Sequence, residues 1–341
     1  MPNNSQRDRI NLILAAFILV QSAGMAAAPR SLDGVDDAVA AEIKTTVYAT
    51  ILPDDEKGFA RMGPPKPLDW RSFYKEMPQT LERYKIATRV RPTAERRVIV
   101  LQPLGEMDAE QRNILEAMRE YAGIFFQTPV RIEKPLALEL PEGERGLIRM
   151  LPSGNRHGIY DRQYNGETIM SAILEKHLPA DAIVSLGITM SDLYSGDMNF
   201  VFGVGSFDKR VGVYSLCRYF PEFWGIRRSP GDEVIALRRA CKVLNHETGH
   251  MFGLTHCVFY YCSMNGSNSL EETDSAPIHF CPLCHRKLLW NIGFDPVKRF
   301  TQLEEFYREH EMTQEADWMS ARIRNWNTAM AVEIARKAGD E

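Results

Sequence analysis

Residues 246–256 read HETGHMFGLTH, and this stretch decides which fold the rest of the chain is expected to adopt. It closes a segment, 232–251, whose apolar residues recur mostly every three to four positions, which predicts a long amphipathic helix. His246 and His250 are one helical turn apart, so both rings project from the same face and can bind one metal ion. Gly253 lets the chain leave the helix, and the turn brings His256 back as a third ligand.

The residue beside the first histidine is a carboxylate. Glu247 is placed to reach a water molecule on the metal rather than the metal itself, which is the position that a general base needs. Three neutral nitrogens leave one coordination position open, as in a catalytic zinc site. The five fixed positions of the pattern arise by chance in a chain of this composition with a probability on the order of 10⁻⁵. A helix whose histidines bind nothing is the alternative.

The pattern H-E-x-x-H-x-x-G-x-x-H resembles the signature of the metzincins, a clan of zinc peptidases. Met264 follows His256 within the segment CSMNG at 262–266. In metzincins a methionine after a tight turn lies under the metal ligands as an apolar floor. The resemblance therefore assigns that position to Met264.

Four of the six cysteines form two close pairs directly after the third histidine. These are Cys257 with Cys262 and Cys281 with Cys284. Thiolate pairs at such short spacing, joined by a loop, are typical of a closed tetrahedral zinc site. Two disulfides in an exported chain and unpaired thiols in a reducing compartment are the alternatives. A redox role for the C-x-x-C pair is less favoured, because its surroundings do not resemble thioredoxin.

The stretch from His246 to Cys284 resembles the archaemetzincins, peptidase family M54, in which cysteine zinc ligands follow the third histidine. The segments that carry this similarity are MNGSN at 264–268, LEE at 270–272, CPLCHRKL at 281–288, ITMSDLY at 188–194 and NFVFG at 199–203. The resemblance spans roughly residues 97–295 and is strongest over the last forty or so. It implies two zinc ions per chain, a catalytic one on the three histidines with Glu247 as base and a structural one on the four cysteines.

Upstream of the motif, strand-like and helix-like patterns alternate. The predicted strands are 98–101, 130–132 and 183–188, and the predicted helices are 108–126 and 168–177. Two further strand-like runs, 199–204 and 211–214, flank a turn-prone segment and predict a hairpin with one edge strand. We therefore expect an α/β (α+β) zincin-like domain: a mixed twisted sheet, an antiparallel edge strand and a long active-site helix. The predicted substrate-binding part of that edge is Phe200, Val201, Phe202 and Gly203, by strand addition.

Four segments make up the predicted organisation. Residues 1–28 combine Arg7 and Arg9, the apolar run 10–20 and an Ala-rich end, which is typical of a signal peptide. An uncleaved anchor or a misplaced start codon would give a similar pattern. An N-terminal extension (29–95), the metalloprotease domain (96–295) and a helical C-terminal extension (296–341) follow. The signal-like segment predicts export to the periplasm or the extracellular space, with a cytoplasmic location as the alternative.

Composition narrows the function classes. The chain has 341 residues, of which 44% are hydrophobic and 25% charged, as in ordinary globular proteins. Its 41 Lys and Arg against 45 Asp and Glu give a net charge of −4, which disfavours a nucleic-acid partner. No stable membrane partner is expected after signal removal.

The sequence thus predicts a zinc metallopeptidase that acts on peptides or proteins. Hydrolysis would proceed by Glu-assisted attack of a metal-bound water. A catalytically idle, zinc-stabilised module that binds peptides or proteins is the alternative, and a hydrolase of non-peptide amides is a third possibility.

Overall fold

The computed structural model describes residues 58–151 and 161–325 of the chain. The predicted signal segment 1–28 lies outside the described residues, as do 29–57 of the N-terminal extension and 326–341 of the C-terminal one.

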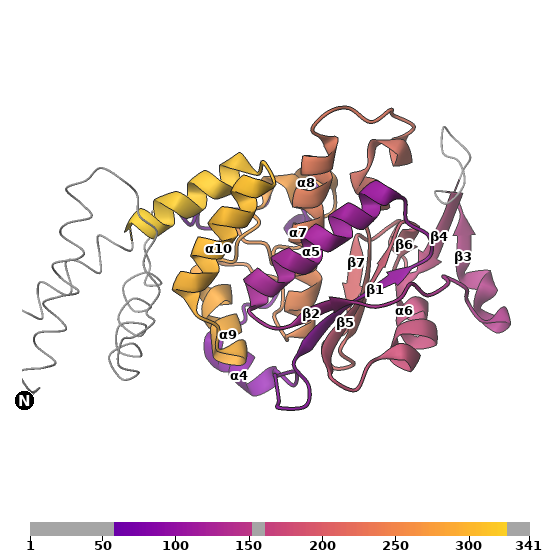
Figure 1. Cartoon of the computed structure of the whole chain (residues 1–341), viewed down its shortest axis with the longest axis horizontal. Helices are drawn as coiled ribbons and strands as arrows, with labels where there is room; N and C mark the ends of the chain where they lie inside the picture. Colours follow the sequence, from indigo (N-terminus) through magenta and orange to yellow (C-terminus); the bar gives the residue numbers. More distant parts are fainter. Residues whose placement is uncertain (1–57, 152–160, 326–341) are drawn as a thin grey trace, which may run out of the picture.

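A five-stranded sheet lies at the centre of the fold (Figure 1). Its strands, in spatial order, are β2 (Val130–Ile132), β1 (Val98–Leu104), β5 (Ala182–Thr189), β8 (Val211–Ser215) and β7 (Gly203–Gly205). The first three pairings are parallel, whereas β7 runs antiparallel to β8. The central strands β1 and β5 are buried almost throughout, as expected for parallel strands covered on both faces. The predicted mixed sheet with an antiparallel edge strand is confirmed.

Helices cover both faces of this sheet. On one face, α5 (Ala109–Phe126) and α7 (Asp232–Met251) share a hydrophobic cluster with Ile99 and Leu186. On the other face, α6 (Gly166–Ile169) and the turns that follow it pack with Val211 and Val213. The alternating side chains of a strand thus serve two separate cores. The domain is an α/β fold, as predicted.

The chain after α7 adds three helices and a further helical segment. These are α8 (Leu270–Ser275), α9 (Pro282–Ile292), α10 (Pro296–Glu309) and residues 313–325. The rings of Phe306 and Tyr307 on α10 lie 5.3 and 6.1 Å from that of Tyr121 on α5. The described part of the predicted helical C-terminal tail therefore packs on the main core through α10. Figure 1 shows α9 and α10 at the opposite end of the domain from the strand β3 (Ile148–Met150).

The described part of the N-terminal extension, 58–95, contains the short helices α3 (Trp70–Phe73) and α4 (Leu81–Ala87). Tyr84 is completely buried, and its hydroxyl donates a 2.8 Å hydrogen bond to the carbonyl of Phe252, just after α7. The backbone N–H of Met62 donates a 3.1 Å hydrogen bond to the carbonyl of Phe259. The extension therefore packs along the turn that follows the active-site helix.

A second, three-stranded sheet was not predicted from the sequence. It consists of β3 (Ile148–Met150), β4 (Arg162–Asn165) and β6 (Asp192–Tyr194). Short 3-10 turns occur elsewhere in the chain, at η1 (Glu142–Leu147), η5 (Cys217–Tyr219) and η6 (Pro221–Trp224). The Asp192 carboxylate is fully buried and accepts two 2.7 Å hydrogen bonds from the Arg218 guanidinium. Strands of three or four residues give too short an alternation to be recognised in sequence.

The helix predicted at 168–177 is divided into three parts. It begins as α6, continues as the π-helical turn η3 (Met170–Leu174) and ends as the 3-10 turn η4 (Glu175–His177). The apolar residues Ile169, Ile173 and Leu174 are still buried together, so the predicted apolar face is present although the hydrogen bonding varies.

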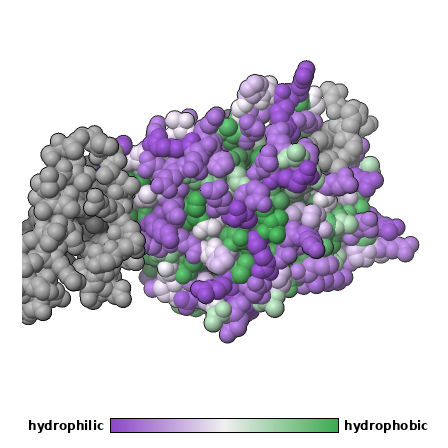
Figure 2. Space-filling view, in the orientation of Figure 1, coloured by the Kyte–Doolittle hydropathy of each residue, from purple (hydrophilic) through white to green (hydrophobic). Residues whose placement is uncertain are grey.

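Among the described helices, none combines the length and the apolarity needed to cross a bilayer. Figure 2 shows a mainly hydrophilic face, with hydrophobic residues in smaller areas between the polar ones.

Candidate active site and metal centres

The end of α7 and the turn after it bring three histidines together. The Nε2 atoms of His246 and His250 are 2.9 Å apart. At Gly253 the backbone adopts φ 88°, and a Cβ there would lie 2.6 Å from Oγ1 of Thr88, so only glycine fits this turn. The turn returns His256, and the three ligand atoms lie within 4.8 Å of one another. One ion can therefore contact all three rings.

The first two rings are oriented by backbone carbonyls. Nδ1 of His246 lies 2.9 Å from the oxygen of Ser263, and Nδ1 of His250 lies 2.8 Å from that of Leu254. An acceptor at Nδ1 favours the tautomer with its proton there, which leaves the Nε2 lone pair for a metal. Burial lowers the pKa of His246 to about 3 and also lowers that of His250. Both rings are thus held neutral, the form that binds metal.

The third ring has a carboxylate partner instead. Nδ1 of His256 lies 2.7 Å from Oε1 of Glu76, and Nε1 of Trp70 donates to the same oxygen at 2.6 Å. The hydrogen bond with His256 is the main cause that lowers the pKa of Glu76. Sequence reasoning missed this residue, because it lies 180 positions before His256 and is one of 45 acidic residues without a spacing signal.

The Glu247 side chain lies against the edge strand β7. A Cβ on Gly203 would lie 2.7 Å from Oε1 of Glu247, and a Cβ on Gly205 would lie 3.3 Å from Oε2. Val204 between them packs in the core on the opposite face of the sheet. The two glycines therefore make the space that the carboxylate fills. Burial raises the pKa of Glu247 to about 8.

Met264 packs directly against the histidine-bearing helix. Its side chain is fully buried, and a Cβ on Gly249 would lie 2.4 Å from its Sδ atom. Gly249 immediately precedes His250, so the thioether lies beneath the ligand-bearing turn of α7.

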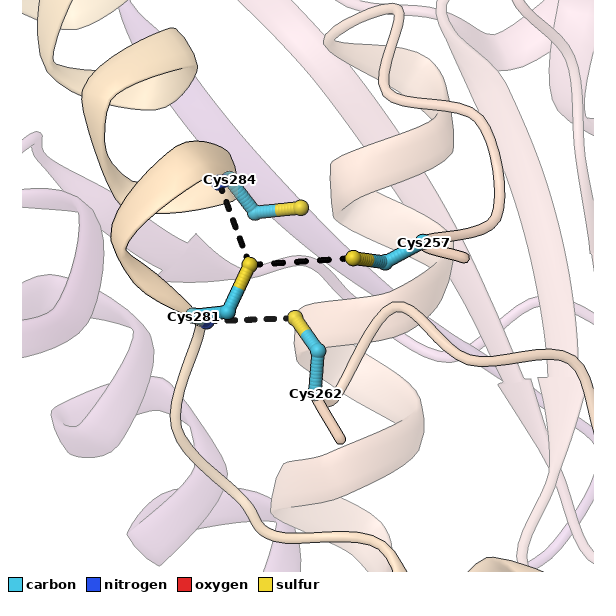
Figure 3. Close-up of side chains that lie close together, drawn as sticks. All are labelled: Cys257, Cys262, Cys281 and Cys284. Atoms are coloured by element: carbon cyan, nitrogen blue, oxygen red, sulfur yellow. Dashed lines mark hydrogen bonds between the residues drawn. The ribbon is translucent and has the colours of Figure 1, made fainter. Parts of the chain in front are cut away.

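Four cysteine side chains converge in a second group, shown in Figure 3. Cys281 and Cys284 lie at the start of α9, whereas Cys257 and Cys262 come from the loop after the third histidine. All are between 0% and 4% exposed, and all are free thiols. The sulfur atoms of Cys257 and Cys281 are 3.7 Å apart. Zn–S bonds of about 2.3 Å give a tetrahedral edge of about 3.8 Å, so the cluster fits a closed zinc site.

The two groups share one segment of the chain. Cys257 directly follows the third histidine, and its N–H donates a 2.8 Å hydrogen bond to the carbonyl of Met264. Cys262 directly precedes Ser263, whose carbonyl accepts from His246. The loop that presents the thiols therefore also positions the floor and one acceptor of the histidine group.

The edge strand begins later than predicted. Of the predicted segment 200–203, only the last residue belongs to β7. The Phe200 ring lies 3.8 Å from the guanidinium carbon of Arg218, and Phe202 stacks on Tyr219 at a centroid distance of 5.6 Å. Val201 forms an isolated antiparallel bridge with Leu193 on β6, and the Phe202 carbonyl accepts the N–H of Ser215 at the end of β8, so the segment is paired locally without extending β7 as a continuous strand.

Comparisons with known proteins agree with the site. Residues 107–289 match the model of Peptidase family M54, which covers more than half of the chain. The chain belongs to peptidase family M54. Archaemetzincin-2 of Pongo abelii is 33% identical over 265 residues, which cover 70% of this chain and 71% of the relative. Archaemetzincin of Thermococcus kodakarensis is 41% identical over 133 residues, covering 39% of this chain and 70% of the relative.

A crystal structure of archaemetzincin from Archaeoglobus fulgidus is also similar. It is 27% identical and covers 56% of this chain and 99% of that chain, with a TM-score of 0.42.

This M54 member is accordingly a zinc metallopeptidase of the archaemetzincin family, and its substrates are peptides or proteins. The predicted family and enzyme class are confirmed. Glu76 and Trp70 lie outside the matched residues 107–289.

Proposed function

We propose that the chain hydrolyses peptide bonds at a site with His246, His250 and His256 as metal ligands and Glu247 as general base. The observation that carries this proposal is the convergence of three imidazoles, each with an acceptor at Nδ1, beside a carboxylate that is buried against the edge strand. The three histidines would hold a zinc ion there, which would lower the pKa of a water molecule toward about 7 and polarise the substrate carbonyl.

Glu247 moves one proton through the reaction. In its ionised form, the carboxylate accepts the proton of the attacking water as the new C–O bond forms at the substrate carbonyl. It then delivers that proton to the amide nitrogen as the C–N bond breaks, so the base is regenerated with the amine product. Contact with Gly203 and Gly205 keeps the carboxylate next to the strand on which the substrate is expected to lie.

We place the substrate along the outer edge of β7. This strand is the last in the sheet order, and its only partner strand is β8 among the described residues. A peptide in extended conformation can pair with such an edge through its main chain. Such pairing uses the main-chain N–H and C=O groups of the strand and not its side chains. The proposed binding site is therefore the backbone of Gly203–Gly205, with the preceding segment 200–202 beside it.

A second zinc ion is proposed for the four cysteines. Burial of all four thiols, the approach of their sulfur atoms to within 4.8 Å of one another and the 3.7 Å between the sulfurs of Cys257 and Cys281 support a closed structural site. Metal analysis of the purified protein is expected to give two zinc ions per chain. A single zinc together with oxidised cysteines would instead favour disulfides.

The test of the mechanism is Glu247→Gln. We expect zinc content and melting temperature to stay unchanged while hydrolysis of a peptide mixture, followed by mass spectrometry, falls by about 10²- to 10⁴-fold. Glu233→Gln, at the solvent-exposed start of the same helix, is the matched control and should retain full turnover. Undiminished hydrolysis by Glu247→Gln would refute its role as base. Peptide binding without hydrolysis by the wild type would favour the idle binding module.

We also propose that residues 1–28 direct export. The basic start, the apolar run 10–20 and the Ala-rich end support this. N-terminal sequencing of native protein should find a mature end near Pro29, whereas a soluble cytoplasmic protein that retains residue 1 or 2 would contradict export.

A further inference from the structure

The N-terminal extension touches the metal site through one segment, residues 66–79, which we call the strap. Its Glu76 carboxylate contacts Nδ1 of His256, and its Trp70 indole meets the same imidazole edge to face at a centroid distance of 5.3 Å. The side chains of His256 and Glu76 are only 19% and 20% exposed. This hydrogen bond is therefore largely shielded from water and more directional than a surface ion pair.

The strap is itself held at two points. The backbone N–H of Trp70 donates to both carboxylate oxygens of Glu272, at 2.9 and 3.1 Å. A Cβ on Gly266 would lie 2.5 Å from the indole, so the Met264 loop leaves room for the ring only because glycine stands there. At the other end, the Gln79 amide donates to the carbonyl of Gly253 at 2.9 Å. Glu76 is thus presented by a supported segment.

The three zinc-ligand candidates differ in what faces Nδ1. His246 and His250 have carbonyl acceptors from the region that the family model covers, whereas His256 has an anionic acceptor from outside it. A carboxylate at Nδ1 fixes the tautomer and the ring plane, and it makes Nε2 a stronger donor to the metal than a carbonyl does. His256 is also the ligand that follows the helix, on a turn, where its orientation depends most on outside contacts.

We infer that Glu76 is a positioning residue of the metal site and that the strap is part of the catalytic unit. This rests on the proposed zinc site at the three histidines. It moves the functional boundary of the metallopeptidase domain from residue 96 to at least residue 66.

The test compares variants of the full chain. Zinc affinity of the histidine site is measured by chelator competition in wild type, Glu76→Ala, Glu76→Gln and Glu76→Asp. We expect Glu76→Ala to weaken binding by about 10- to 100-fold, Glu76→Gln by less because its amide oxygen can still accept, and Glu76→Asp to recover part of the loss. Glu82→Gln removes an exposed carboxylate from the first turn of α4 and should leave the affinity unchanged.

Cobalt substitution supplies a second readout that a merely structural role would not change. The d–d absorption of Co²⁺ at the histidine site is expected to shift in Glu76→Gln, while the thiolate charge-transfer bands of the cysteine site stay as in wild type. Wild-type zinc affinity and an unaltered cobalt spectrum in Glu76→Gln and Glu76→Ala would overturn the inference. Should Glu76→Ala fail to fold, Glu76→Gln decides alone. A wild type that binds no zinc at the histidines would instead refute the proposed function.

Discussion

The histidine group and the cysteine group are neighbours in the chain but differ in what completes them. The four thiols come from residues 257–284, are at most 4% exposed and converge on one another, and the backbone N–H groups that point at them belong to the same segment. The histidines come from residues 246–256, and their Nδ1 atoms face Leu254 within that segment but Ser263 and Glu76 outside it. We therefore expect the cysteine group, which is closed and built from one segment, to stabilise the fold. We expect the histidine group, which is supported from several segments and leaves a coordination position open, to carry the catalysis. The predictions below test that division.

The largest effect is expected for Cys281→Ala. The Cys281 sulfur lies 3.7 Å from that of Cys257, and its side chain also accepts the backbone N–H of Cys284 at the start of α9. Since binding of structural zinc is worth about 10–16 kcal/mol in small domains, we expect the free energy of unfolding to fall by about 5 kcal/mol or more. Denaturant unfolding measures this.

Cys241→Ala is the matched control for that change, because Cys241 is also completely buried but lies on α7 outside the cluster. It should cost only about 1–2 kcal/mol, the price of a small cavity. Equal losses for the two variants would contradict a structural metal at the cysteines.

His250→Ala is expected to abolish function while the fold survives. The variant should lose one zinc per chain and at least about a hundredfold in peptide hydrolysis, since several kcal/mol of transition-state stabilisation depend on the metal. Metal analysis measures the zinc content, and circular dichroism measures whether the fold survives. His177→Ala, an exposed histidine outside both groups, should change neither. If His250→Ala unfolds the chain as Cys281→Ala does, the division between the groups is wrong.

The pH dependence of stability tests the contact of Lys242, on the histidine-bearing helix α7, with α8, which lies between the two cysteine pairs. Lys242 lies one turn before His246 on α7, and its Nζ donates to the carbonyls of Thr273 and Asp274 on α8. Burial lowers its pKa from 10.5 to about 8, against the opposing charges of Asp274 and Glu315. Below pH 8 the lysine is charged in both folded and unfolded chains, and its contribution does not vary with pH.

Between about pH 8 and 10.5 the unfolded chain binds more protons at Lys242, so the free energy of unfolding rises with pH there. We expect a rise on the order of 3 kcal/mol relative to Lys242→Met, measured by urea unfolding across this window. Parallel pH profiles for the two proteins would show that the buried amine does not titrate in this way.

The smallest effect is expected for Gly249→Ala. The new methyl group would lie 2.4 Å from Sδ of Met264, but the flexible thioether can move. Overpacking of this kind costs about 1–3 kcal/mol, and the displaced floor should also weaken zinc binding at the histidines. Gly143→Ala, where a Cβ meets no atom within 4 Å, is the control for thermal unfolding and chelator competition. If Gly249→Ala changed neither the melting temperature nor the zinc affinity, Met264 would not support the histidine ligands.

The sequence was most informative where chemistry depends on local spacing. One helical turn separates His246 from His250 whatever the rest of the fold does, and the strands β1 and β5 and the helix α5 follow equally local patterns. The start of β7 could not be predicted, because the contacts of Phe200 with Arg218 and of Phe202 with Tyr219 are tertiary. The partner of His256 was hidden for the same reason, since nothing near Glu76 in the chain marks it.

The direct succession of His256 and Cys257 has a consequence for how this site can vary between proteins. Consecutive Cα atoms are about 3.8 Å apart, so an insertion between these residues would pull one ligand out of reach of its group. Grafting the histidine motif onto another scaffold would therefore require transplanting the cysteine loop with it.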